Sequence, residues 1–354
     1  MPRCVGTVGQ VSIQAMRQED LTDDDMLAQA ILRGDRRALA RGITLVESEL
    51  PAHQERAERL LNILLPKTGR SIRVGISGPP GVGKSTFVEA FGMHAITEQH
   101  QVAVLAIDPS SRLSGGSILG DKTRMEDLSR HRSAFVRPSP AGRTLGGVAR
   151  RTREAALLCE AAGFDLIIVE TVGVGQSEAA VADMVDVFLL LIAPGGGDEL
   201  QGIKRGIVEL VDIVVVNKAD GDLLNAAGRI AAEYHGALGL LRHQAKRWRP
   251  EVVQCSALER RGVDTVWQTL ERCIAAFREG GDWTRRRAGQ RHDWMWQEIT
   301  GGILDALRRD ETVAGLAAQL EAEVAANRLL PPAAARKVRQ AFLQRGEVDA
   351  EPPR

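Results

Sequence analysis

The segment GPPGVGKST, residues 78–86, constrains the fold of this chain more than any other feature of its sequence. It matches the pattern G-x-x-x-x-G-K-[S/T], directly follows the apolar run IRVGIS, and directly precedes a helical pattern that continues through Phe91. Its glycines let backbone N–H groups curl around phosphate oxygens, and the N-terminus of the following helix adds partial positive charge. A strand, this loop and a helix in this order predict a P-loop phosphate-binding site.

Short apolar segments alternate with helical stretches from residue 72 onward. They are IRVGIS, VAVLAID, AFVRP, DLIIVET, DVFLLLI, DIVVVNK and EVVQCS. Strands that are rich in valine and isoleucine, apolar on both faces and separated by helices indicate a mostly parallel sheet covered on both sides. We therefore predict an α/β fold, a P-loop NTPase with a mostly parallel sheet flanked by helices, over residues 71–280.

The sequence before this core has helical periodicity. We predict a disordered extension over residues 1–20 and a helical segment over residues 21–70, in which Thr22 is the N-cap of the first helix and Gly34 its stop. The apolar faces expected in the next two helices are Leu39, Ile43, Val46 and Leu50, and then Leu60, Leu61, Leu64 and Leu65.

The sequence after the core, residues 281–354, is predicted to be a helical arm. A polar, basic stretch, GGDWTRRRAGQRHD, is expected to precede three short amphipathic helices. Their apolar stripes must pack on the body or on a second copy of the chain, and we favour a homodimer. The RRRAGQR run is interpreted as a solvated helix face rather than an RNA site, because the chain has only 4% aromatic residues and no net charge.

The composition excludes several kinds of partner. Lysine plus arginine and aspartate plus glutamate both number 46, so no net field favours nucleic acid or an anionic membrane. The longest apolar run, residues 187–193, is far shorter than a membrane span, and the N-terminus lacks an apolar signal core. We expect a cytoplasmic protein that binds neither membrane nor nucleic acid. The four cysteines are widely spaced and are expected to be reduced and mostly buried.

The P-loop predicts a site that binds nucleotide phosphates and Mg²⁺. Lys84 is expected to reach the β- and γ-phosphates, and the Ser85 hydroxyl to bind Mg²⁺. The predicted nucleotide-binding residues of the loop are Gly78, Pro79, Pro80, Gly81, Val82, Gly83, Lys84, Ser85 and Thr86.

The sequence VVVNKAD places an N-K-x-D pattern after another buried strand, and the Asp220 carboxylate can accept both the imino and amino hydrogens of guanine. A polar turn that merely closes the strand is the alternative. The base-binding residues predicted here and in the later segment CSALERRG are Asn217, Lys218, Asp220, Ser256, Ala257 and Leu258. We therefore favour GTP and GDP over ATP as ligands.

Three acidic residues are candidates for the catalytic and metal site. Asp108 ends the strand AIDPSS and Asp121 lies in GGSILGDKTRM, where each can hold Mg²⁺ or, alternatively, cap a helix. Glu170 ends the run DLIIVET, where most nucleotide-hydrolysing P-loop proteins have aspartate. Its longer side chain can orient or deprotonate the attacking water or hold a magnesium-bound water, and a structural acid is the alternative. Gly173 lies three residues after Glu170, and its N–H could contact the γ-phosphate.

With these residues the chain resembles the MeaB/ArgK family of P-loop GTPases, which accompany adenosylcobalamin-dependent acyl-CoA mutases, typically methylmalonyl-CoA mutase. The resemblance runs from about Leu21 to about Phe342. Its markers are GPPGVGKST, AIDPSSRLSGGSILGDKTRM, RPSPAGRTLGG, LLCEAAGFDLIIVETVGVGQSE, GGGDELQGIK and NKAD. It implies a helical N-terminal segment, a central GTPase domain and a C-terminal arm through which two subunits dimerise.

The resemblance also implies a function and residue roles. GTP hydrolysis would gate the loading of intact cofactor onto the mutase and protect or rescue the mutase from inactivation. Lys84 and Ser85 would bind phosphate and Mg²⁺, Asp108 and Asp121 would belong to the magnesium site, and Glu170 would be the glutamate that distinguishes this group of GTPases. The loop APGGGDELQGIK would be a third switch that communicates with the mutase, although its composition alone indicates an ordinary flexible loop. Its candidate residues are Gly195, Gly196, Gly197, Asp198, Glu199 and Lys204.

Some features keep other interpretations open. In RPSPAGRTLGG, relatives usually carry Ser-Ser-Gly where this chain has Ala141, Gly142 and Arg143, and Arg143 can act on phosphate charge in cis or be solvated. A nucleotide-dependent kinase or energiser of basic amino-acid transport is one competing function. A metallochaperone GTPase is another, although His235 and His243 lack a cysteine or carboxylate partner set. The sequence does not identify which acyl-CoA mutase would be the partner.

Overall fold

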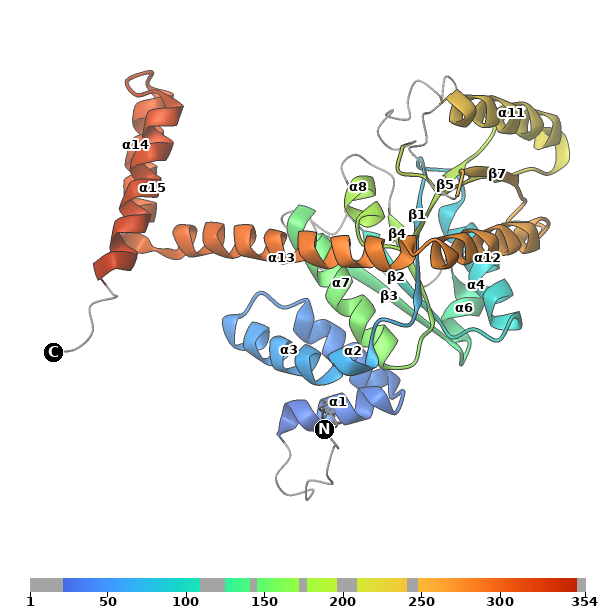
Figure 1. The fold of residues 1–354 in the computed structure, drawn as a ribbon, viewed down its shortest axis with the longest axis horizontal. Coiled ribbons are helices and arrows are strands. Elements are labelled where there is room, and N and C mark those ends of the chain that lie inside the picture. Colours follow the sequence, from blue (N-terminus) through green and yellow to red (C-terminus); the bar gives the residue numbers. More distant parts are fainter. Residues whose placement is uncertain are drawn as a thin grey trace, which may run out of the picture. The chain divides into compact units, whose positions relative to one another are not determined.

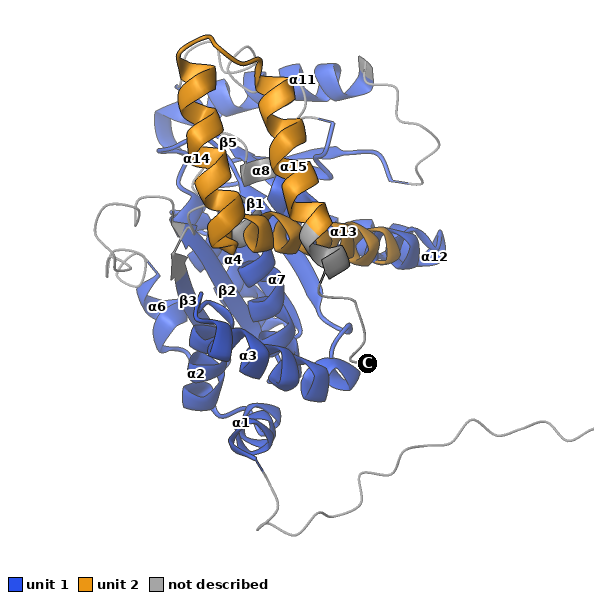
Figure 2. Ribbon diagram, turned by 90° about the vertical axis from the view of Figure 1, so that its left-hand side faces the viewer, with its two compact units in different colours: residues 1–287 blue, residues 288–354 orange. Residues whose placement is uncertain are grey.

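The computed structural model describes residues 22–108, 125–140, 145–171, 177–195, 209–240 and 248–348. The chain divides into two compact units, Met1–Arg287 and Ala288–Arg354 (Figure 2). Each unit is described by itself. The predictions for residues 1–20 lie outside the described residues.

Seven strands of the described residues form one sheet in the first unit, and every paired neighbour runs parallel (Figure 1). They are β1 (Ile72–Ser77), β2 (Val102–Asp108), β3 (Ala134–Pro140), β4 (Leu166–Thr171), β5 (Val187–Ile192), β6 (Ile213–Val216) and β7 (Glu251–Gln254). Their order in the sheet is β3-β2-β4-β1-β5-β6-β7. The predicted α/β fold is confirmed, and β1 lies between β4 and β5, so the P-loop leaves the sheet near its centre.

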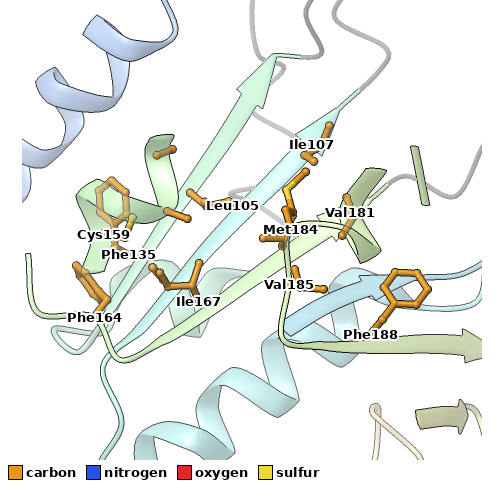
Figure 3. Packing of buried hydrophobic residues seen from close by; sticks show 14 of the residues in the cluster. Leu105, Ile107, Phe135, Cys159, Phe164, Ile167, Val181, Met184, Val185 and Phe188 are labelled. Carbon is orange, nitrogen blue, oxygen red and sulfur yellow. The ribbon is translucent and has the colours of Figure 1, made fainter. Parts of the chain in front are cut away.

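Helices cover both faces of the sheet because its strands are apolar on both sides. One face packs against α4 (Lys84–Thr97), α6 (Glu126–Arg130) and α12 (Val263–Glu279). The other packs against α7 (Leu145–Ala161), α8 (Ser177–Ala182) and α11 (Leu224–Leu240). Figure 3 shows part of this second layer, where Leu105 and Ile167 of the sheet pack near Cys159, Met184 and Val185.

The N-terminal helical segment packs against α7 and extends the apolar core on the face of the sheet that α7, α8 and α11 cover. It contains α1 (Asp23–Leu32), α2 (Arg36–Val46) and α3 (Pro51–Leu64), followed by the short 3₁₀ helix η2 (Leu65–Lys67). Thr22 caps α1 in a reciprocal box with Asp25, as the sequence predicts for that N-cap.

Two leucines expected on apolar faces of these helices are exposed instead. Leu50 is 59% exposed and Leu65 is 57% exposed. Pro51 occupies the first position of α3, so α2 has already ended and Leu50 lies at the N-cap of the next helix. Leu65 lies in η2, which turns the chain away from the face that buries Leu60 and Leu64.

The C-terminal helices also differ from the prediction. Within the described residues they are α13 (Asp282–Arg309), α14 (Glu311–Ala325) and α15 (Pro331–Val348). The three predicted helices are present, but the first is not short and no polar stretch precedes it, because α13 has 28 residues and includes the whole basic run.

The basic run is not a solvated face throughout. Arg287 is 7% exposed and pairs with the buried carboxylate of Asp186, which precedes β5. Arg286 donates to Asp212 at 3.1 Å, at the start of β6. Both arginines therefore fix the first turns of α13 to the amino ends of the strands, because buried carboxylates require a charged or hydrogen-bonding partner.

Two other sequence expectations concern bilayers and thiols. Within the described ranges no helix combines the length and the apolar character that crossing a bilayer requires. Cys159, Cys255 and Cys273 are free and buried, as predicted. Burial raises the pKa of Cys255 to about 12, so its thiol stays protonated at neutral pH.

Candidate functional site

The P-loop is shaped by glycines that pack closely against neighbouring strands. A Cβ on Gly78 would lie 2.2 Å from the carbonyl oxygen of Leu191, at the end of β5. Gly83 has a φ of +89°, and a Cβ there would lie 2.9 Å from the side-chain nitrogen of Asn217. Neither position can hold a side chain without moving backbone or a motif residue, so both glycines are needed to bring the loop close to β5 and β6.

Lys84 begins α4 and folds back over the loop. Its Nζ donates to the carbonyl oxygens of Gly78 at 2.7 Å and Pro79 at 3.0 Å. Lys84 lines a cavity of about 450 Å³. The residues that line this cavity are Pro80, Gly81, Gly83, Lys84, Ser85, Thr86, Ala106, Ile107, Glu170 and Thr171. A hollow of this size, with backbone N–H groups and a lysine along one side, suits an anionic small molecule.

Glu170 lies directly beside Ser85. It pairs in register with Ile76 of β1, whose side chain belongs to the core under α4. Because paired residues of parallel strands point to the same face, the Glu170 side chain points toward α4. The Ser85 hydroxyl donates to its Oε1 at 3.2 Å, and the glutamate is only 7% exposed. A carboxylate and a hydroxyl oxygen side by side are the kind of ligand that Mg²⁺ prefers.

The predicted base-binding residues form a second group that is attached to the P-loop. The side-chain amide of Asn217 donates to the carbonyl oxygen of Val82 at 2.9 Å and accepts from the N–H of Ala257 at 3.0 Å. Lys218 donates to the carbonyl oxygen of Gly81 at 2.7 Å, from a backbone with a φ of +58°. The N-K-x-D segment therefore joins the P-loop to the segment that follows β7.

Asp220 is held by that same segment. The Ser256 hydroxyl donates to its carboxylate, and the N–H of Glu259 donates to the Ser256 oxygen at 3.1 Å. Leu258 between them is 79% exposed. The segment that follows β6 thus places the Asp220 carboxylate near the P-loop, and a carboxylate can accept hydrogen bonds from the imino and amino groups of guanine.

Comparison with known proteins assigns the chain to a family. The family model described as "Methylmalonyl Co-A mutase-associated GTPase MeaB" matches residues 39–312. The chain belongs to the MeaB family. A probable GTPase of Mycobacterium tuberculosis is 51% identical over 328 residues, which cover 93% of this chain and 97% of the relative. The predicted family resemblance is confirmed.

Two further similarities are informative. A mitochondrial methylmalonic aciduria type A homolog of Mus musculus is 46% identical over 331 residues, covering 91% of this chain and 80% of the relative. The crystal structure of a protein described as LAO/AO transport system kinase has a TM-score of 0.73 and 38% identity, covering 92% of this chain and 99% of that chain. This MeaB-family chain is a GTPase that binds guanine nucleotide and hydrolyses GTP.

Several predicted residues of this MeaB-family site cannot be placed. Asp108 ends β2, but its side chain is outside the described residues, and Gly195, at the end of the described part of its loop, has a φ of +105°. The predicted site residues that lie wholly outside the described ranges are Asp121, Gly173, Gly196, Gly197, Asp198, Glu199 and Lys204, together with Arg143. Their roles stay predictions.

The structure adds residues that the sequence reasoning missed. Ala106 and Ile107 line the cavity from β2, and Thr171 lines it from β4. Thr171 also donates a hydrogen bond to Ser77, the last residue of β1, at 2.8 Å. The sequence did contain a signal for this pair. Ser77 directly precedes the P-loop and Thr171 directly follows Glu170, and a parallel sheet brings these two strand ends to one edge.

Proposed function

We propose that this GTPase gates the loading of adenosylcobalamin onto a cobalamin-dependent acyl-CoA mutase, with methylmalonyl-CoA mutase as the first candidate, and protects or reactivates that mutase. The observation that carries the proposal is the match of residues 39–312 to a family described as methylmalonyl-CoA mutase-associated. The name of the mouse relative, a methylmalonic aciduria type A homolog, supports the same partner.

The proposed chemistry follows from the phosphate cavity. Lys84 binds the β- and γ-phosphate oxygens after releasing its two loop carbonyls, which lie 2.7 Å and 3.0 Å from its Nζ. Ser85 and Glu170 are the described residues that would hold Mg²⁺ or its waters, and a bound Mg²⁺ would neutralise charge on the phosphates. Glu170 also orients or deprotonates the attacking water, because it is a buried carboxylate at the edge of the cavity.

The guanine base is proposed to bind to the N-K-x-D segment. Asp220 accepts the two guanine hydrogens, while Asn217 and Lys218 hold this segment against the P-loop through Val82 and Gly81. Asp108 and Asp121 would complete the magnesium site, and the N–H of Gly173 would contact the γ-phosphate. The segment 193–204 responds to the nucleotide and contacts the mutase.

The second unit supports the proposal of a homodimer. Its three helices line an open apolar hollow of about 630 Å³. Ile303 is 55% exposed, Leu304 44% and Leu343 62%. Exposed apolar side chains on these helices are typical of a surface that another chain covers, and a second copy is the occupant we propose.

The test is steady-state GTP hydrolysis by the full chain, alone and with a stoichiometric adenosylcobalamin-dependent acyl-CoA mutase from the same organism. We expect at least about a ten-fold stimulation, a barrier change of roughly 1.4 kcal/mol. Lys84→Ala serves as the control, because it removes the phosphate cation and must abolish both the basal and the stimulated rate. A rate of GTP hydrolysis that does not change when the mutase is added would refute the coupling but not the GTPase activity.

A nucleotide-dependent kinase linked to basic amino-acid transport is the second candidate, favoured by the description of the 38% identical solved structure. The two candidates differ in the fate of the γ-phosphate. Radiolabelled GTP would release inorganic phosphate in the first case and label an acceptor molecule or protein in the second. A stoichiometric labelled acceptor would overturn the mutase proposal.

A further inference from the structure

Two hydroxyl groups join the strand that carries Glu170 to the strand that leads into the P-loop. Thr171 ends β4 and Ser77 ends β1, and the Thr171 hydroxyl donates to the Ser77 oxygen at 2.8 Å. Both residues are 0% exposed. The bond is thus shielded from water, which would otherwise compete for both groups.

This bond takes over where the backbone pairing between the two strands stops. The register of β1 and β4 ends with Ile76 opposite Glu170. Thr171 continues to pair with Ile107 of β2 on its other side. On the side of the P-loop, the side-chain bond to Ser77 therefore extends the connection by one residue beyond the last backbone pair.

Glu170 and Thr171 point to opposite faces of the sheet, since successive side chains of a strand alternate. Glu170 points toward Ser85 in α4. The Thr171 face is the one that α8 covers, because a Cβ on Gly75 would lie 2.9 Å from both Val181 and Val185 there. The end of β4 is therefore held on both faces of the sheet. The Glu170 carboxylate contacts Ser85 on one face, and the Thr171 hydroxyl contacts Ser77 on the other.

We infer that Thr171 is a positioning residue for GTP hydrolysis, which acts through its bond to Ser77 to fix the backbone from which Glu170 reaches the cavity. The inference rests on the proposed role of Glu170. Without the bond, the last residue of β4 can shift away from β1, and the Glu170 carboxylate moves with it. A displacement of about 1 Å in a catalytic group can slow a reaction about 100-fold.

The first test compares kcat and KM for GTP in Thr171→Val, Ser77→Ala and the double variant. Valine keeps the shape of threonine and replaces the hydroxyl with a methyl group. We expect kcat to fall at least about ten-fold in each single variant, within the range that such misplacement produces, with KM and fluorescent GDP affinity unchanged. The double variant should lose no more than either single one, because both remove the same bond. Thr171→Ser should restore kcat.

Thr269→Val is the matched control. Thr269 is also 0% exposed, and its hydroxyl donates to the carbonyl oxygen of Thr265 within α12, outside the nucleotide cavity. It should lose thermal stability without losing kcat. A Thr171→Val protein with normal kcat, or with a loss confined to KM, would overturn the inference. Should Thr171→Val fail to fold, Ser77→Ala tests the same bond from the other strand.

Glu170→Gln in the same assay separates this inference from the proposal on which it rests. Slow hydrolysis by Glu170→Gln together with normal hydrolysis by Thr171→Val and Ser77→Ala would refute the positioning role alone. Normal hydrolysis by Glu170→Gln would instead refute the catalytic role of the glutamate, and the positioning role with it.

Discussion

Replacing Arg287 with alanine should destabilise the first unit strongly. Its Nε and Nη2 each lie 2.7 Å from a carboxylate oxygen of Asp186, and its Nη1 and Nη2 donate at 2.6 Å to the carbonyl oxygens of Gly69 and Ser71. Desolvation opposes the charge of Arg287, but the hydrogen bond and charge of Asp186 outweigh it and raise the pKa of the guanidinium. The pair therefore stays ionised while buried.

The cost can be worked from what the truncation leaves behind. Asp186 is 2% exposed, so without Arg287 its carboxylate stays buried with its charge unpaired. Removing one partner of a buried pair costs about 3–5 kcal/mol. The N–H of Arg73 still donates to Asp186 at 2.8 Å, so we expect the loss of stability to lie at the lower end of this range. A loss of about 3 kcal/mol corresponds to a fall in Tm of roughly 5 °C for a unit of this size.

Thermal and urea unfolding of the full chain, followed by circular dichroism, provide the measurement. Arg285→Ala is the control from the same helix, because Arg285 forms a surface pair with Asp282 and its side chain is 70% exposed. Such pairs contribute about 0–1 kcal/mol. An Arg287→Ala protein no less stable than the control would refute the reasoning. The pair lies at the amino end of β5, away from the P-loop, so kcat of the folded variant should not change.

Three other predictions concern the nucleotide site and the thiols. Glu170→Gln should slow GTP hydrolysis by about 100-fold or more while GTP still binds, because the amide cannot accept a proton, and single-turnover rates with a nucleotide-binding assay would check this. Asp220→Asn should relax the preference for guanine toward xanthine, measured by competition between GTP and XTP, and unchanged selectivity would place base recognition elsewhere. Cys255, with a pKa near 12 and 2% exposure, should react with a disulfide reagent at pH 8 only after denaturation, and rapid labelling of the native protein at this residue would contradict its burial.

The parts of the site that the sequence predicts well are those whose geometry is local. The P-loop spans nine residues, and its strand, turn and helix follow one another, so spacing alone fixes their relation. The N-K-x-D segment could be predicted for a related reason, because parallel strands bring their carboxyl ends to one edge of the sheet. Asn217 meets the P-loop there although the two segments are far apart in the chain.

The parts that sequence patterns missed depend on pairs of distant residues. Thr171 and Ser77 are 94 positions apart, and Arg287 and Gly69 are 218 apart. Nothing in a single sequence connects a hydroxyl or an arginine with one particular partner at such a distance. The errors at Leu50 and Leu65 have another cause, since a proline follows each of them and marks the break that the apolar periodicity hid.

The length of the Glu170 side chain is explained by the position of α4 relative to β4. The Ser85 hydroxyl lies 3.2 Å from Glu170 Oε1, already near the outer limit of a hydrogen bond. An aspartate on the same backbone would withdraw the carboxylate by about one C–C bond, roughly 1.5 Å, and the contact would be lost. Because Gly78 cannot accept a Cβ against Leu191, the P-loop has little freedom to move and close that gap. The extra methylene of Glu170 thus spans a distance that the sheet and the P-loop have already fixed, with Ser77 and Thr171 holding the strand from which it starts.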